Sequence, residues 1–171
     1  MKRIFAFCLA LMMLLTLAAC GGEQPANNND TTAAGTNVAT DAAPVMLDMP
    51  TLYQAMKDAV ALPEMMELNE GLMLNFCGVN SADTKQAIVA ICADSLRTDE
   101  IWLIEAVDAE AAARIKTLAE TRLDQKDAES ITYSPEQNAV VKKAKLICEG
   151  NYVVLLVSPD SDALAQVYNQ K

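Results

Sequence analysis

The sequence predicts an α+β domain, in which an antiparallel sheet of about four strands carries packed helices and two further helices precede it. Two apolar segments of strand length, residues 86–93 and 100–107, are separated by a short polar stretch. A second pair, residues 139–148 and 152–157, is joined across a turn in which Gly150 supplies the positive φ. A helical pattern follows each pair, and this order is typical of an α+β fold.

The chain opens with a predicted signal peptide, residues 1–19. Lys2 and Arg3 precede an almost unbroken apolar run that ends in small residues, which is the layout of a secretory signal. A membrane-spanning helix needs about 20 apolar residues, and this run is shorter. The motif Leu-Ala-Ala-Cys at residues 17–20 resembles a bacterial lipobox, which implies cleavage before Cys20 and a diacylglycerol on its sulfur.

A lipid on Cys20 would anchor the protein to the extracytoplasmic face of the cell membrane. Stable anchoring takes two acyl chains, and a diacylglyceryl group supplies both at one residue. The alternative is an ordinary signal peptide, with Cys20 near the cleavage point by chance. The lipidation of Cys20 is the one chemical role that the sequence assigns to a residue.

Residues 20–48 combine this cysteine with a predicted disordered linker, and residues 49–171 form one predicted α+β domain. The linker is rich in Gly, Ala, Asn, Thr, Asp and Pro, and it shows no periodicity. Its reach is about 30 Å, because a flexible chain spans about 5–6 Å × √n.

The mature chain is strongly acidic. Loss of Lys2 and Arg3 with the leader leaves 11 basic and 23 acidic side chains, a net charge of −12. This balance argues against nucleic-acid binding, which needs clustered Lys and Arg. It also argues against electrostatic adhesion to anionic lipid, so the membrane contact is expected through Cys20 alone.

Two helices are predicted at the start of the domain. The first begins at Met49 and ends before Pro63, with apolar side chains on one face. The second is predicted over residues 64–76, although Gly71 lies inside it. This region is rich in methionine, which is typical of core filling; the alternative is an adaptable binding surface.

The longest predicted helix spans residues 109–126, with Asp108 as its N-cap. Residues 127–138 are polar and predict a loop with room for one helical turn. The closing helix is predicted to begin at Pro159, with Ser158 as its N-cap. The two halves share the order strand, turn, strand, cap, helix. Two such ββα units could pair into one sheet with helices on one face, and coincidence of propensity is the alternative.

A family likeness rests on motifs near the C-terminus. The sharpest are Gly-Asn-Tyr-Val-Val at residues 150–154 and Ser-Pro-Asp at residues 158–160. With the lipobox and the order of elements over about residues 50–171, they resemble bacterial lipoproteins of domain-of-unknown-function family 4358. Cys77 and Asn80 depart from the turn such proteins often carry. The resemblance implies a lipid-anchored, Gram-positive-type protein of unassigned activity, and it transfers no catalytic residue.

The chain contains no histidine, which removes the Ser-His-Asp and Cys-His systems and the commonest zinc ligand. No glycine-rich phosphate loop is present. Carboxylate pairs lie at expected caps and turns, where the helix dipole explains most of them. These carboxylate pairs are Asp99 with Glu100, Asp108 with Glu110, and Asp160 with Asp162. We therefore predict no catalytic, cofactor-binding or metal-binding residue.

Three cysteines remain in the domain, Cys77, Cys92 and Cys148. An odd number leaves at least one thiol free. Cys92 and Cys148 occupy similar places in the two hairpins and could form a disulfide if the sheet brings their strands together. The favoured interpretation is that all three are small buried side chains.

Two further features allow a binding role. Lys142, Lys143 and Lys145 form a basic cluster, which could recognise an anionic partner but more often guards an exposed edge strand. Trp102 could be an interface hot spot if exposed, although core packing is favoured.

The sequence favours a non-enzymatic binding or scaffold module whose partner is an envelope protein, a peptide or a small ligand. The alternative is a carboxylate- or cysteine-dependent envelope enzyme. An enzyme predicts a deep pocket with converging Asp, Glu or Cys, whereas a partner module predicts a shallow apolar patch.

Overall fold

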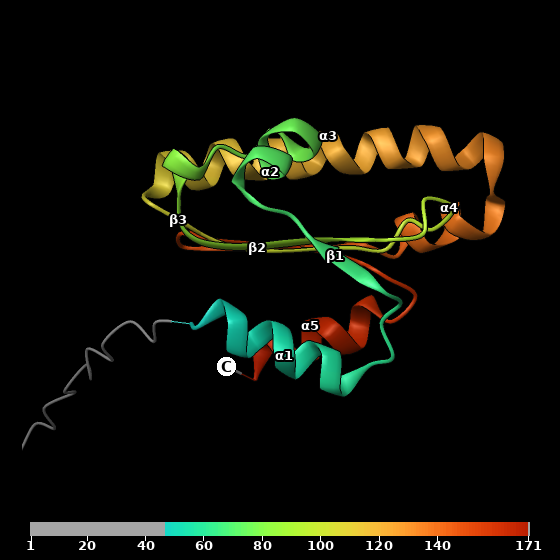
Figure 1. Ribbon diagram of the computed structural model, residues 1–171, viewed down its shortest axis with the longest axis horizontal. Helices are drawn as coiled ribbons and strands as arrows, with labels where there is room; N and C mark the ends of the chain where they lie inside the picture. Colours follow the sequence, from blue (N-terminus) through green and yellow to red (C-terminus); the bar gives the residue numbers. More distant parts are fainter. Residues whose placement is uncertain (1–46, 171) are drawn as a thin grey trace, which may run out of the picture. The chain divides into compact units, whose positions relative to one another are not determined.

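The computed structural model describes residues 47–170, which form a five-stranded antiparallel sheet between two layers of helices (Figure 1). The predicted α+β class is confirmed. The strands are β1 (Met65–Glu67), β2 (Thr84–Cys92), β3 (Glu100–Ala106), β4 (Lys145–Glu149) and β5 (Tyr152–Val157). The helices are α1 (Met49–Ala59), α2 (Glu70–Cys77), α3 (Ala109–Tyr133), α4 (Pro135–Lys142) and α5 (Ser161–Asn169), with a short 3-10 turn at Ser81–Asp83. The signal peptide, Cys20 and most of the linker lie outside the described residues.

The strand order is β1-β2-β3-β5-β4, so the two predicted hairpins meet at the central pair β3 and β5. The second hairpin turns at Gly150, whose φ of 56° lies in the left-handed region that glycine adopts without strain. Every residue of β3 is buried. A strand apolar on both sides must be covered on both sides, which explains the two helix layers.

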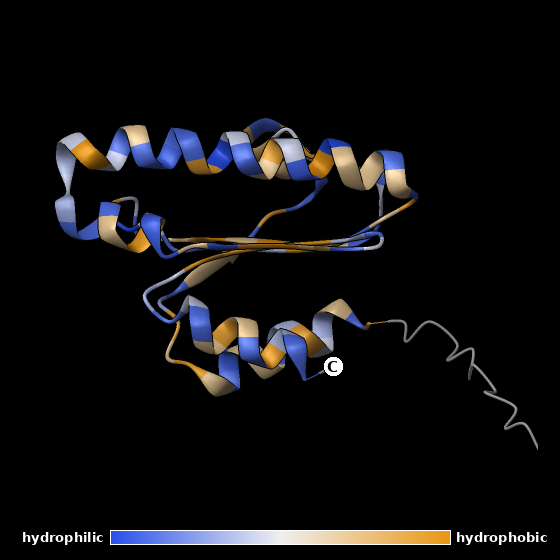
Figure 2. Cartoon of the chain, turned by 180° about the vertical axis from the view of Figure 1, so that it is seen from behind, coloured by the Kyte–Doolittle hydropathy of each residue, from blue (hydrophilic) through white to orange (hydrophobic). Residues whose placement is uncertain are grey.

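Side chains alternate between the two faces of the sheet. Trp102 and Ile104 of β3 belong to the core beneath α2, α3 and α4. Ile101 and Leu103 belong to a second core, closed by α1 and α5. Figure 2 shows the largely hydrophobic strands between these layers. The expectation of helices on one face is therefore wrong, because α3 and α5, the helices of the two ββα units, lie on opposite faces.

The predicted helix over residues 64–76 is also wrong at its start. Residues Met65–Glu67 form the edge strand β1, in which Met65 pairs with Cys92 of β2. Asn69 then caps α2 by accepting a hydrogen bond from the Leu72 amide, with a 3.0 Å distance from N to Oδ1. Pairing with β2 overrides the helical spacing of this segment.

The loop predicted over residues 127–138 is helical. The helix α3 continues to Tyr133, and α4 follows at once with Ser134 as its N-cap and Pro135 in its first turn. The predicted strand at 139–148 therefore begins only at Lys145. The closing helix begins at Ser161, two residues after the predicted first position at Pro159. The extension of α3 forms one wall of a groove at the end of the sheet where β2 meets β3.

Candidate functional site

A groove of about 770 Å³ lies at the end of the sheet where β2 ends and β3 begins. Its walls are the β2–β3 loop, the C-terminal half of α3, the start of α4 and the last turn of α2. In Figure 1 the loop between β2 and β3 reaches α4 beside the end of α3. The groove thus gathers four segments that are distant in the sequence.

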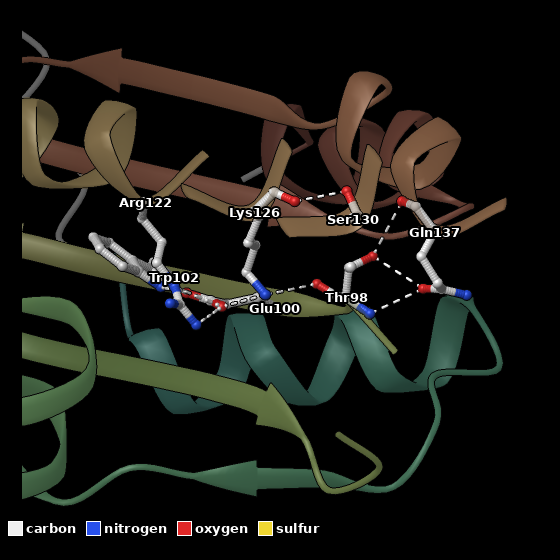
Figure 3. A network of polar contacts seen from close by, with 7 residues as sticks. All are labelled: Thr98, Glu100, Trp102, Arg122, Lys126, Ser130 and Gln137. Carbon is white, nitrogen blue, oxygen red and sulfur yellow. Dashed lines mark hydrogen bonds and ion pairs between the residues drawn. The ribbon is translucent and has the colours of Figure 1, made fainter. Parts of the chain in front are cut away.

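A buried carboxylate lies beneath the groove. Glu100 is fully buried at the start of β3, and two cations from α3 contact it (Figure 3). Arg122 Nε lies 3.1 Å from Oε1 and Arg122 Nη2 lies 3.0 Å from Oε2. Lys126 Nζ lies 2.8 Å from Oε2. One carboxylate is therefore shared by two cationic side chains.

The same carboxylate binds the indole of the single tryptophan. Trp102 Nε1 donates to Glu100 Oε1 over 2.7 Å, and both side chains are fully buried. Residues two apart on a strand share a face, which places the indole beside the carboxylate. The predicted core position of Trp102 is confirmed, but its polar partner was not predicted.

Local sequence explains how the cluster forms. Arg122 and Lys126 are four residues apart, so they lie on one face of α3. Like charges at this spacing destabilise a helix. The pair of cations therefore indicates that a carboxylate from another element lies between them. Glu100 opens a strand whose next four residues, 101–104, are all apolar. These two signals together could have identified the cluster, whereas the pattern of adjacent acids placed Glu100 at a turn.

The cations keep Glu100 ionised. Burial alone would raise the pKa of Glu100, but the charges of Lys126 and Arg122, with their hydrogen bonds, lower that pKa below its usual value. Burial also tends to lower the pKa of Arg122, and the bond to Glu100 outweighs burial and raises it. The cluster of two cations and one carboxylate therefore carries one surplus positive charge.

The β2–β3 loop is held against both helices. The Thr98 amide donates to Gln137 Oε1 over 2.9 Å, and Lys126 Nζ donates to the Thr98 carbonyl over 3.1 Å (Figure 3). Ser130 Oγ in turn donates to the Lys126 carbonyl over 2.6 Å. These bonds fix the groove's opening between the loop and α3.

The groove wall contains an unsatisfied acceptor. Asp99 is only 2% exposed, and its Oδ2 accepts a 3.0 Å hydrogen bond from Arg97 Nε. Its Oδ1 is the one buried side-chain nitrogen or oxygen within residues 47–170 that has no hydrogen-bond partner. Buried polar atoms are nearly always bonded, so this oxygen indicates a missing donor.

The rim of the groove is apolar and exposed. Phe76, Leu96 and Tyr133 line it and are 50%, 81% and 87% exposed. Isolated exposed apolar residues are normal, but three around one opening indicate a contact surface. The site thus joins the pocket expected of an enzyme to the apolar patch expected of a binding module.

Cys77, Cys92 and Cys148 are free thiols, so the possible disulfide between Cys92 and Cys148 is not formed. Cys92 lies on β2 and Cys148 on β4, with β3 and β5 between them, so about 14 Å separates the strands at about 4.8 Å per step. Cys92 and Cys77 are buried as favoured, whereas Cys148 is exposed. Burial, and then the Glu100 carboxylate, raises the pKa of the Cys77 thiol to about 12.

The other predicted residues lie away from the groove. Lys145 is on β4, an edge strand, and pairs with Asp162 over 2.7 Å between Nζ and Oδ1. Lys142 and Lys143 are instead at the end of α4. Asp108 caps α3 as predicted, accepting from the Ala111 amide at 2.7 Å. Among the residues described, no three His, Cys, Asp or Glu side chains are placed to hold a metal ion.

The family model of a domain of unknown function (DUF4358) matches residues 58–158. The chain belongs to this family. The match confirms the family expected from the C-terminal motifs, while the lipoprotein character stays a prediction. All five strands and the whole groove of this DUF4358 domain lie inside the matched range, and α5 lies outside it.

No curated protein and no solved structure matches the chain. Within residues 47–170, none of the helices combines the length and apolar character needed to span a bilayer.

Proposed function

We propose that the protein is a lipid-anchored extracytoplasmic lipoprotein whose domain is a non-enzymatic binding module, with the groove as its binding site. The observation that carries the proposal is the combination of an apolar rim, a charged floor and the unsatisfied Asp99 Oδ1 around one opening. The volume of the groove lies within the range of about 300–1,000 Å³ typical of ligand sites. Few polar groups among apolar walls are likewise typical of such sites.

The chemistry of the floor favours binding over catalysis. Glu100 is engaged by Trp102, Arg122 and Lys126, so its oxygens are committed to the protein. A cysteine-dependent enzyme needs a thiolate, and the Cys77 pKa of about 12, caused by burial, keeps this thiol protonated at neutral pH. The enzyme alternative would have to use Cys92 or Asp99 in the groove.

The anchor of the proposed module is a diacylglycerol on Cys20, supported by the lipobox likeness of residues 17–20. Because the mature chain carries a net charge of −12, electrostatic attraction to anionic lipid would not assist membrane binding. The lipid would therefore act alone. If the mass of the mature N-terminal peptide shows an unmodified Cys20, the anchoring part of the proposal is wrong.

A site-specific crosslinking experiment tests the groove. A photoreactive amino acid replaces Leu96 at the rim in cells, and the same amino acid replaces Ile131 in a matched strain. Ile131 is an exposed apolar residue of α3 that does not line the groove. We expect discrete adducts from position 96 but not from position 131.

The Cys20→Ala variant tests whether this capture depends on the anchor. We expect the position 96 adducts to weaken when the lipid site is removed, since the protein would leave the membrane. Equal capture from positions 96 and 131, or none from either, would contradict the groove as the binding site.

A further inference from the structure

The floor of the groove retains unused hydrogen-bond donors. A guanidinium has five N–H groups and an ammonium has three. Arg122 commits Nε and Nη2 to Glu100, and within residues 47–170 no acceptor contacts its Nη1. Lys126 Nζ uses Glu100 Oε2 and the Thr98 carbonyl, which leaves its third proton without a protein partner in the same range. Both side chains line the groove.

The charges of the floor favour an anion. Glu100 neutralises only one of the two mostly buried cations, and a buried surplus charge is costly until an opposite charge approaches it. Glu129 also lines the groove, but it is exposed to solvent, which screens its charge. A guanidinium fork is matched to the two oxygens of a carboxylate.

The wall of the groove needs a hydrogen-bond donor, whereas the floor needs an anion. Asp99 lines the groove and its Oδ1 lacks a donor, but this oxygen is buried, so a ligand N–H supplies the missing bond only when the Asp99 side chain turns toward the groove. The rim side chains Phe76, Leu96 and Tyr133 offer apolar contacts above it. One ligand would satisfy all three surfaces if it carried a carboxylate, an amide N–H and an apolar side chain.

We propose that the groove binds the C-terminal end of a short peptide with apolar terminal residues, an inference that rests on the groove being the binding site. The terminal carboxylate lies against Arg122 and Lys126. The Asp99 side chain turns toward the groove and its Oδ1 accepts a hydrogen bond from a backbone N–H of the peptide, and the apolar side chains of the peptide contact the rim. A fatty carboxylate shares the acid but lacks the amide donor, and this difference separates the two ligand classes.

The single tryptophan provides the measurement. Trp102 is hydrogen-bonded to Glu100, which is bonded to Arg122 and Lys126, so an anion at the floor should change its emission. The full-length protein in nanodiscs is titrated with N-acetyl-Ala-Leu-Phe as the free acid, with the same peptide as its C-terminal amide, and with octanoate. The free acid should bind roughly tenfold or more tightly than the amide, the order expected for a charge-assisted hydrogen bond.

Two variants locate the bound peptide. Leu96→Ser should weaken binding of the free acid several-fold, whereas the matched change Ile131→Ser should not alter it. Arg122→Lys keeps the charge that Glu100 requires and removes the fork, so it should reduce the preference for acid over amide. If Arg122→Lys lowers the melting temperature, the comparison of Leu96→Ser with Ile131→Ser still tests whether the peptide binds in the groove. Leu96 is 81% exposed, so its replacement should not affect folding.

Equal affinity for acid and amide would overturn the carboxylate site, and octanoate binding as tightly as the free acid would overturn the peptide. Crosslinking from position 96 that persists in either case would show that only the ligand class is wrong. Loss of that crosslinking as well would remove the proposed function itself.

Discussion

Replacing Glu100 by glutamine removes one negative charge from the floor of the groove and almost no volume. The amide oxygen can still accept the Trp102 indole N–H, now 2.7 Å from Oε1, so the change isolates the charge. Among the described residues, Glu100 is the only carboxylate that forms an ion pair with Arg122 and Lys126, and the variant would lose it. Two mostly buried cations would face each other without a counter-ion.

The expected loss follows from the burial of the cluster. Removing one partner of a buried ion pair costs about 3–5 kcal/mol. Arg122 keeps some contact with solvent, which relieves part of this cost, so we expect about 3 kcal/mol for Glu100→Gln. For a domain of this size the melting temperature should fall by roughly 10 °C. Denaturant unfolding followed by Trp102 fluorescence and by circular dichroism measures the change.

Glu120→Gln is the matched control. Glu120 pairs with Lys116 over 2.8 Å between Oε1 and Nζ, but both side chains are about half exposed. Exposed ion pairs contribute little, so this variant should unfold almost like the wild type. A Glu100→Gln variant as stable as Glu120→Gln would refute the buried cluster as described.

Three further predictions concern other features of the domain. Because the folded-state pKa of Glu100 is lowered below its usual 4.5, its contribution to stability should be complete above that pH and lost as pH falls further; acid unfolding monitored by circular dichroism should show a shallower acid limb in Glu100→Gln than in the wild type. In the mature native protein a maleimide should label Cys148 quickly and the buried Cys77 slowly, with mass spectrometry counting the adducts; equal rates would contradict their different burial. Gly150→Ala should destabilise the second hairpin by about 1 kcal/mol, because φ is 56° there, whereas Gly71→Ala inside α2 should leave stability unchanged or raise it; urea midpoints in the opposite order would contradict the assigned turn.

Local patterns predicted much of the fold. Three elements could be identified from local sequence: β3 and β5 from their apolar runs, and the start of α3 from its Asp108 cap. Strand burial and helix capping depend on residues that are close together in the sequence, so both leave a local pattern. The strand β1 could not be predicted in this way. Its residues Met65–Glu67 have helical spacing and become a strand only by pairing with β2, some 25 residues later.

The groove was missed for a related reason. Residues 127–133 are polar, so they predicted a loop, although their helix is held by the buried Lys126 and Ser130 instead of an apolar stripe. Adjacent acids suggested a turn at Glu100, and its partners lie 22 and 26 residues away on α3. Polar networks between distant elements leave no periodic signal.

The packing of α1 against α5 sets the order in which the domain can be completed. Each hairpin closes over a short stretch of chain, and β3 and β5 then join the two. The core that includes Met56 and Leu164 needs both helices, and α5 is synthesised after every other helix and strand described in residues 47–170. Until it arrives, α1 and one face of the sheet stay uncovered. A nascent chain halted before Ser161 would therefore expose an apolar surface and be a target for chaperones and proteases.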